Sequence, residues 1–322
     1  MISLPFLWPQ SRPGRALVHA IRFVSIKKVE KRLARMFPGG IPVLFSSGRA
    51  ALTYSLLING LSRGDKVGTF PFASHCVLDA VSRVATPVAL DNLVSHKVVF
   101  QQWGFSQHHG LSANDVEDCA DSLLMPGGEL FQGGGGFEIW SLPKILGTTG
   151  GGILWCRSSD AAAALQRLRN PHKNAAFLWG LRLLGHYTPF VHTLWQGAEA
   201  SMGKPSRLQT GEILDALDGW NEIVLDRRKK YDLVRPFAPS WLKLQADRLP
   251  CVVPVVLKQN IDGEILALKA GISSGQRVIE HHFASGTCEL VRVLPIPIHQ
   301  DVSIGRLGSM MNLIKPHIRM EV

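Results

Sequence analysis

Short apolar segments alternate with amphipathic ones from Ser46 to Cys156, and this alternation constrains the fold more than any other feature of the sequence. Glycine, proline and aspartate bound the segments, as is typical of strands and helices in a mainly parallel α/β sheet. We expect helices at residues 50–61 and 76–84, and strands at residues 66–70, 87–91, 98–100, near Val116, 137–140 and 152–156.

The chain has a different character on either side of this region. Before residue 42 it resembles a helix with a loose start, and after about Ser159 it becomes mostly helical, with a long run over residues 210–234. Two strand-like segments, at 251–257 and 289–294, are mixed with helices near the end, which predicts a smaller α+β domain. The sequence thus predicts an N-terminal helical segment over residues 1–41, a large α/β domain over 42–205 and a small C-terminal α+β domain over 206–322.

The chain is strongly basic, with 35 Lys and Arg against 25 Asp and Glu and a net charge of +10. This balance favours anionic partners. The excess gathers in residues 12–35 and 227–230, and charge runs of this kind usually form solvated helix faces. No RNA- or DNA-binding motif accompanies them, so we expect no nucleic-acid partner, whereas an N-terminal segment lying on a membrane stays an open alternative.

The cysteines and the apolar segments indicate in which cellular compartment the protein is expected. Five cysteines stand at scattered positions without a C-x-x-C pair. No apolar run approaches the roughly 18 residues of a membrane span, and the N-terminus lacks the charged start and cleavage site of a secretory signal. These features predict a reduced, cytoplasmic protein.

Three segments carry residues suited to chemistry, and each also has an ordinary structural explanation. Residues 46–49 begin a predicted helix, whose free amides can hold a phosphate, although a serine there is usually only a cap. Glu117, Asp118 and Asp121 follow a short strand, where α/β sheets bind ligands, although acids there more often cap a turn. Lys144 lies between a buried strand and a glycine cluster. A desolvated amine there is nucleophilic, and the alternative is a lysine that reaches solvent.

Metal and hydrolase sites are poorly supported by the sequence. His108 and His109, and His281 and His282 with Cys288, are the candidate metal ligands. Adjacent histidines seldom bind one ion, and no tetrahedral spacing completes either set, so we expect no metal site. The G-x-S-x-G motif of serine hydrolases is absent from the sequence.

In their order and spacing, these segments resemble the DegT/DnrJ/EryC1/StrS sugar aminotransferases, which are pyridoxal phosphate (PLP) enzymes of fold type I. The resemblance runs from about Pro42 to the end of the chain. It rests on SGRAAL at 47–52, GLSRGDKV at 60–67, SHC at 74–76, TPVALD at 86–91, EDCA at 117–120, SLPK at 141–144 with GGG at 150–152, RRKKY at 227–231 and LPIPIH at 294–299. It implies a mainly parallel sheet of the seven-stranded type flanked by helices, followed by a smaller α+β C-terminal domain.

The resemblance also implies a role for each matching residue. The implied cofactor-binding and catalytic residues are Gly48 and Arg49 at the phosphate, Ser141 nearby, His75 over one face of the PLP ring, Asp118 at the pyridine nitrogen, and Lys144 as the amine that bonds the cofactor and moves protons.

Two positions depart from the family pattern. Asp121 stands where the family usually has Gln or His, near the phenolic oxygen of the cofactor, and we count it among the cofactor-binding residues. Residues 205–207 align with the family's N-x-R segment, whose asparagine reaches the phosphate of the neighbouring subunit, but here the asparagine position is Pro205.

The resemblance implies a PLP-dependent aminotransferase that moves an amino group from an amino acid, glutamate in the family, to a keto-sugar. The sugar is expected to be nucleotide-linked and to serve polysaccharide or antibiotic-sugar biosynthesis. The alternative is a catalytically silent protein of this fold that acts as a regulator or scaffold. We also expect a homodimer with the active site at its interface, from the resemblance and from the apolar segment 177–195.

Overall fold

The computed structural model describes residues 7–11, 18, 24–90, 94–105, 110–170, 202–282 and 288–319, together with single residues between 177 and 194. His108 and His109, most of the first basic run before residue 24 and most of the apolar segment 177–195 lie outside these described residues. The expectations for them therefore stay predictions.

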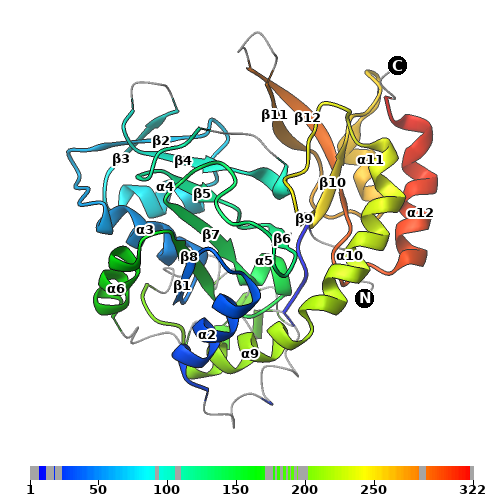
Figure 1. The fold of residues 1–322 in the computed structure, drawn as a ribbon. Helices are drawn as coiled ribbons and strands as arrows, with labels where there is room; N and C mark the ends of the chain where they lie inside the picture. The colour runs from blue at the N-terminus through cyan, green and yellow to red at the C-terminus, as the bar shows by residue number, and fades with distance from the viewer. Residues whose placement is uncertain are drawn as a thin grey trace.

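A seven-stranded sheet forms the first half of the chain (Figure 1). Its order is β1 (Ile41–Phe45), β8 (Gly152–Cys156), β7 (Phe137–Ser141), β5 (Val116–Asp118), β4 (Lys97–Phe100), β2 (Lys66–Thr69) and β3 (Thr86–Ala89). The five strands from β7 to β3 pair in parallel, and β8 runs antiparallel to both of its neighbours. The mainly parallel sheet expected from the sequence is confirmed.

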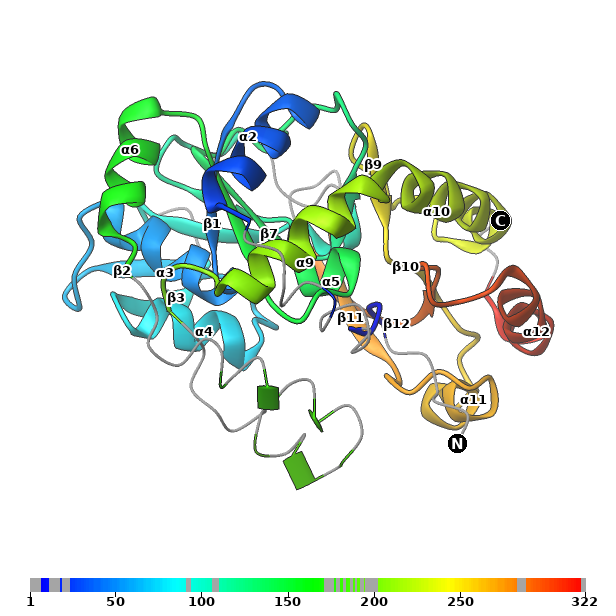
Figure 2. The same ribbon diagram turned by 90° about the horizontal axis from the view of Figure 1, so that it is seen from below.

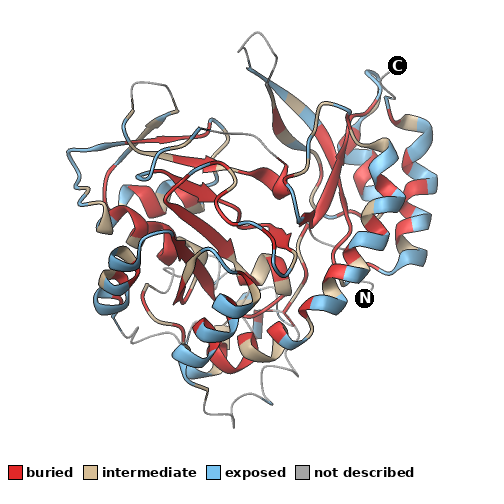
Figure 3. Ribbon diagram, in the orientation of Figure 1, coloured by how far each residue is buried: buried red, intermediate tan, exposed pale blue. Residues whose placement is uncertain are grey.

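Helices cover both faces of this sheet because its strands alternate their side chains. Val43 and Phe45 of β1 pack with α3 (Gly48–Ile58), α4 (His75–Ser82) and α6 (Ser159–Leu168). Leu44, between them, packs on the other face with α2 (Ile26–Met36) and α9 (Arg207–Asp218). A period of two along a strand produces this two-sided burial. The buried strands between the two helix layers are red in Figure 3.

A smaller antiparallel sheet follows, in the order β10 (Val252–Val255), β12 (Cys288–Pro297) and β11 (Arg277–His282). It packs with α10 (Trp220–Val234), α11 (Gly263–Lys269) and α12 (Ile304–Ile314) around a separate apolar core. This is the α+β arrangement that the sequence predicts. Between the two sheets, β6 (Ser122–Leu124) pairs with β9 (Arg248–Pro250). The short 3-10 helices are η2 (Gln102–Gly104), η3 (Arg235–Phe237) and η4 (Lys315–His317).

The long helix expected over residues 210–234 is two helices. A break at Gly219 ends α9 and begins α10, and Figure 2 shows the two helices following one another toward the small sheet. Glycine has a low helix propensity, so its presence at the junction between the two helices is consistent with the break there.

The prediction that residues 227–230 form a solvated helix face is wrong for two of the four residues. Arg228 and Lys229 are exposed, but Arg227 and Lys230 are 0% and 1% exposed. Residues three apart lie on the same side of a helix, so α10 turns this pair inward while its two other cations face water. Among the described helices, none is long and apolar enough to cross a membrane.

Candidate active site

The carboxyl ends of β5 and β7 meet at one edge of the large sheet because these strands are parallel neighbours. Asp118 ends β5, and Ser141 ends β7 and leads directly into the short helix α5 (Leu142–Leu146), which carries Lys144. Asp118 is 8% exposed, and the Ala120 amide donates to its Oδ1 at 3.1 Å. Burial raises the pKa of Asp118, and the positive charge of Lys144 opposes that shift. The fold thus places this carboxyl and this amine within electrostatic reach of each other.

The start of α3 lies beside the same edge. The Ser47 Oγ caps the helix by accepting from the Ala50 amide at 3.1 Å. A Cβ atom built at Gly48 would lie 3.5 Å from the Ser141 Cβ, so residues 93 positions apart adjoin one another here. The free amides and partial positive charge of a helix N-terminus suit a phosphate group. Arg49, the second residue of the helix, is half-buried and adds a cation.

His75 is the first residue of α4 and is exposed. Its Nε2 lies 3.3 Å from the Sγ of Cys76. An exposed imidazole at a helix start can cover a flat ligand, but within the described residues no bond ties it to Asp118 or Lys144. The role of His75 over a cofactor ring therefore stays a prediction.

Asp121 is a second buried carboxyl at this edge. It is 0% exposed, and its Oδ1 accepts from the Trp103 amide at 3.0 Å. Its Oδ2 is buried and has no hydrogen-bond partner among the described residues. Burial raises the pKa of Asp121 to about 7; the charge of Lys144 opposes the shift and that of Asp118 adds to it. The neutral form of Asp121 is thus favoured up to about neutral pH, which limits the second negative charge beside Asp118.

Arg227 supports the helix that carries Lys144, a role that the sequence interpretation missed. Its Nη2 donates to the Ile145 carbonyl at 2.5 Å and to the Gln300 Oε1 at 2.9 Å. The Nε2 of Gln300 also reaches the Ile145 carbonyl, at 3.3 Å. Burial lowers the pKa of Arg227 to about 10, which still leaves it charged at neutral pH. The spacing of Arg227 and Lys230 on one helical face was the signal that could have revealed the buried pair.

Trp8 is a second residue that the sequence interpretation missed. The Nζ of Lys144 lies 4.8 Å from the centroid of its ring, within cation–π distance. The residues on either side, Leu7 and Pro9, are buried. No periodicity or motif links positions 8 and 144, so only the folded chain brings them together.

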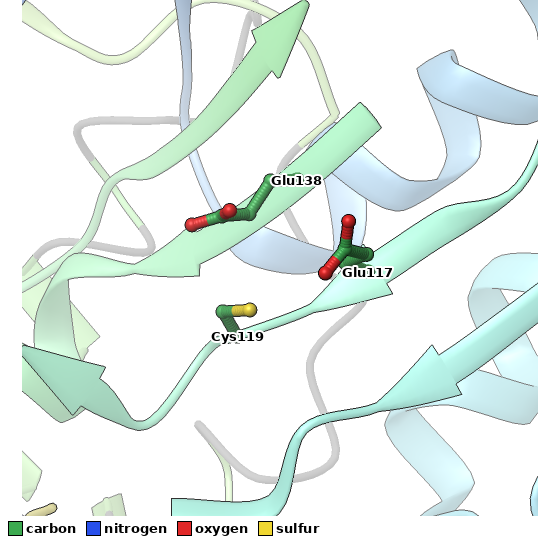
Figure 4. Close-up of side chains that lie close together, drawn as sticks. All are labelled: Glu117, Cys119 and Glu138. Atoms are coloured by element: carbon green, nitrogen blue, oxygen red, sulfur yellow. The ribbon is translucent and has the colours of Figure 1, made fainter. Parts of the chain in front are cut away.

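Glu117, Cys119 and Glu138 form a buried cluster with the spacing of a metal site, in which the ligand atoms lie within 4.8 Å of one another (Figure 4). The Glu117 oxygens accept from the amides of Gly133 and Gly135, at 2.8 and 2.9 Å. Burial and the charge of Glu138 raise the pKa of Glu117, and burial raises the pKa of the Cys119 thiol well above its ordinary value.

Glu138 in this cluster is already satisfied by protein donors. Its Oε1 accepts from the Trp140 Nε1 and from the Arg248 Nη2, and its Oε2 accepts from the Phe131 amide at 2.7 Å. Metal ligands must be deprotonated and have free lone pairs. The cluster therefore fits a structural role, in which two carboxyls and one guanidinium hold the glycine-rich segment 133–136.

The histidines named in the sequence do not assemble a metal site where the structure describes them. The ring of His281 stacks on Trp241 at 4.1 Å, and its Nδ1 lies 3.6 Å from the Glu289 Oε1. His282 is the hairpin partner of Cys288 across β11 and β12, and the orientation of its side chain is outside the described part of the chain.

The residues at the carboxyl edge fit PLP on three observations. Gly48 leaves open the space beside Ser141 that a side chain would narrow. Asp118 is a buried carboxyl near the amine of Lys144, and Asp121 has a buried oxygen to which no described residue donates. An anion cradle, a carboxylate for a pyridinium and an amine are the groups that bind this cofactor.

Comparison with known proteins agrees with this chemistry. A family model described as "Putative PLP-dependent aminotransferase" matches residues 29–232, more than half of the chain. None of the curated proteins matches the sequence.

Solved structures share the fold at low identity. DesV of S. venezuelae is 16% identical with a TM-score of 0.62, over 94% of this chain and 93% of its own. DesI, solved with its TDP-sugar product, is 16% identical with a TM-score of 0.62, over 98% and 92%. The PLP form of Spr1654 from Streptococcus pneumoniae, described as a "Putative sugar aminotransferase", is 13% identical with a TM-score of 0.64, over 98% of each chain.

At these identities the similarity establishes the fold, and it confirms the expected likeness to the DegT/DnrJ/EryC1/StrS aminotransferases of fold type I. The activity and the cofactor follow from the family model. This chain belongs to the PLP-dependent aminotransferases.

Proposed function

We propose that this aminotransferase moves the amino group of an amino acid, glutamate in the first instance, to a nucleotide-linked keto-sugar in polysaccharide or antibiotic-sugar biosynthesis. The observation that carries the proposal is the meeting of Asp118 and Lys144 at the carboxyl edge of the sheet, beside the start of α3. The shared fold with DesV and with DesI, whose structure holds a TDP-sugar product, supports the choice of a sugar acceptor.

Each site residue has a separate task in this proposal. Gly48, Arg49 and Ser141 hold the phosphate, and His75 covers the ring. Asp118 would pair with the protonated pyridine nitrogen, whose positive charge favours the ionised form that burial of this carboxyl disfavours.

Lys144 would be the residue that bonds the cofactor in the resting enzyme and moves the proton of the donor carbon. When bound, PLP would supply the electron sink that makes this carbon acidic. Asp121 would lie on the side of the phenolic oxygen.

The reaction balances without an external oxidant or reductant. The donor loses its amino group and becomes a 2-oxo acid, and the carbonyl of the acceptor becomes an amine. The two halves of this exchange occur in turn at one site, so each can be measured separately. This separation is useful for assigning residues to the donor or to the acceptor.

Borohydride reduction of the purified protein tests the proposal. A pyridoxyl group should appear on the peptide with Lys144 and on no other lysine. Among the lysines that the structure describes, Lys144 is the one beside a buried carboxyl at the carboxyl edge of the sheet. The Lys144→Ala variant should retain PLP through the phosphate and Asp118, yet transaminate neither glutamate nor a TDP-linked keto-sugar. Lys269, which is exposed at the end of α11 beside the small sheet, serves as the matched control through Lys269→Ala.

Two outcomes would reject the proposal in different ways. A label on another lysine, or normal turnover by Lys144→Ala, would show that the site is misassigned. Bound PLP without turnover of any donor and acceptor pair would favour the catalytically silent regulator or scaffold, for which the departures at Asp121 and Pro205 are the supporting observations.

We further propose that the protein is cytoplasmic and that its chain divides near residues 41 and 205 into an N-terminal segment, a large domain and a small domain. We also propose that it forms a homodimer. Large apolar side chains at Phe177, Leu184 and Phe190 are 65%, 57% and 74% exposed, a surface that a second copy would cover. Sedimentation of the PLP-bound protein as a monomer at micromolar concentration would contradict this.

A further inference from the structure

Residues 7–11 form a short N-terminal strap between the large and small sheets, seen as dark blue beside α5 in Figures 1 and 2. Leu7 is 3% exposed and packs with Trp103 and Phe105 on one side and with Val252, Ile279 and Val293 of the small sheet on the other. The strap therefore contacts both halves of the molecule before the chain reaches its first described helix.

The strap is also fixed after Trp8. The Gln10 amide donates to the Asp301 Oδ2 at 2.8 Å. Gly147, which ends α5 with a φ of 75°, approaches the strap so closely that a Cβ there would lie 2.9 Å from the Gln10 carbonyl oxygen and 3.2 Å from the Pro9 Cβ. Trp8 is thus held between an apolar anchor at Leu7 and a polar anchor at Gln10.

Trp8 presents a large aromatic face to the reacting amine. Its ring centroid lies 4.8 Å from the Nζ of Lys144, and the residue as a whole is half-buried. The indole Nε1 is shielded from solvent and has no hydrogen-bond partner among the described residues. The ring, rather than this shielded N–H, is therefore the part of Trp8 that a ligand can contact.

We propose that Trp8 is the platform for the sugar ring of the amino acceptor, an inference that rests on the proposed function above. The carbonyl carbon that receives the amino group must come within about 3–3.5 Å of its reaction partner, so it passes close to the Lys144 amine. A ring system 4.8 Å from that amine contacts the rest of the acceptor molecule. The C–H face of a pyranose packs on the indole face.

The same geometry separates the two substrates. An acyclic amino-acid donor has no flat C–H face to pack on Trp8, and its carboxylates bind to cationic groups instead. Trp8 therefore determines acceptor recognition and contributes little to the reaction with glutamate. If Trp8 served only to position Lys144, its replacement would slow both half-reactions equally, because both use the same lysine.

The experiment compares the two half-reactions in the PLP-bound enzyme. In Trp8→Ala the kcat/KM of the acceptor half-reaction with a TDP-linked keto-sugar should fall about 10- to 100-fold, while the glutamate half-reaction stays within about twofold. Trp8→Phe keeps an aromatic face of smaller area, so its loss should be intermediate. The dissociation constant of the TDP-linked amino-sugar product, measured by calorimetry, should rise in the same order.

Phe237→Ala is the matched control, because Phe237 in η3 is a half-buried ring that lies 4.9 Å from the Nζ of Lys315, packs on the separate core of the small sheet and should leave both half-reactions unchanged. Equal losses in the two half-reactions, or unchanged product affinity in Trp8→Ala and Trp8→Phe, would overturn the platform. Should Trp8→Ala fail to fold, Trp8→Phe allows the same comparison of half-reactions and decides between the two roles. Failure of the wild-type enzyme to use any TDP-linked keto-sugar, while it aminates other 2-oxo compounds, would instead refute the proposed function itself.

Discussion

Replacing Asp121 with asparagine should change how the stability of the protein depends on pH. The wild-type carboxyl is 0% exposed, has one hydrogen bond from the Trp103 amide and leaves its Oδ2 without a partner among the described residues. Burial raises the pKa of Asp121 from 3.8 to about 7, with Lys144 opposing the rise and Asp118 increasing it. Asparagine has nearly the same shape and keeps an oxygen for Trp103, but it does not titrate.

The size of this pH dependence follows from the difference between the pKa of Asp121 in the folded and in the unfolded protein. Below pH 3.8 the carboxyl is protonated in both the folded and unfolded states and makes no pH-dependent contribution. Between about 4 and 7 the unfolded chain releases the proton and the folded chain keeps it, so the free energy of unfolding falls as pH rises. A difference of roughly three pKa units at 1.36 kcal/mol each amounts to a loss of about 4 kcal/mol, complete above pH 7.

Urea unfolding of the cofactor-free protein at pH 5, 6, 7 and 8 measures the part of this loss that falls above pH 5, which is about two of the three pKa units or about 2.7 kcal/mol. The free-energy cost of burying the amide NH2 group of Asp121→Asn is independent of pH. The difference in unfolding free energy between wild type and variant therefore changes from pH 5 to pH 8 only through the carboxyl of the wild type. Asp218→Asn, an exposed residue that pairs with Arg32 at 3.6 Å, is the control and should change little. Parallel pH curves for wild type and Asp121→Asn would refute the burial argument.

Four further substitutions test the site and its support. Asp118→Asn should weaken PLP retention by two to three orders of magnitude, because breaking a buried charge pair costs about 3–5 kcal/mol, and near-normal cofactor affinity by equilibrium dialysis would point to another carboxyl. In Gly48→Ala the new methyl group lies at ordinary van der Waals distance from its neighbours, so the melting temperature should hold while the dissociation constant of PLP rises. Arg227→Met removes the donor to the carbonyl that follows Lys144, and we expect a loss of about 1–3 kcal/mol in unfolding free energy together with slower borohydride labelling of that lysine. Glu117→Ala leaves two loop amides unpaired and should destabilise by about 2–5 kcal/mol without changing the zinc content measured by mass spectrometry; a loss of bound zinc would contradict the structural role.

The sequence by itself determined the elements of the large sheet and the chemistry at its edge. Strands at 66–70, 98–100, 137–140 and 152–156 were predicted within one or two residues, because alternation and turn residues are local properties. The order of Asp118, Ser141 and Lys144 after short buried strands pointed to one edge, since parallel strands bring their carboxyl ends together.

The tertiary structure alone decided which distant residues support and surround that chemistry. The antiparallel direction of β8 and the approach of Trp8 to Lys144 have no local signal. The spacing of Arg227 and Lys230 can indicate that Arg227 faces inward, but not that it meets the Ile145 carbonyl. Sequence periodicity reports that a side chain is buried, but not which of the other elements packs against it. Arg227 looked like one more cation in a basic run because its partners are 73 to 82 positions away. The strap of Trp8 meets Lys144 because Leu7 and Gln10 are fixed by residues that lie roughly 100 to 290 positions further along the chain.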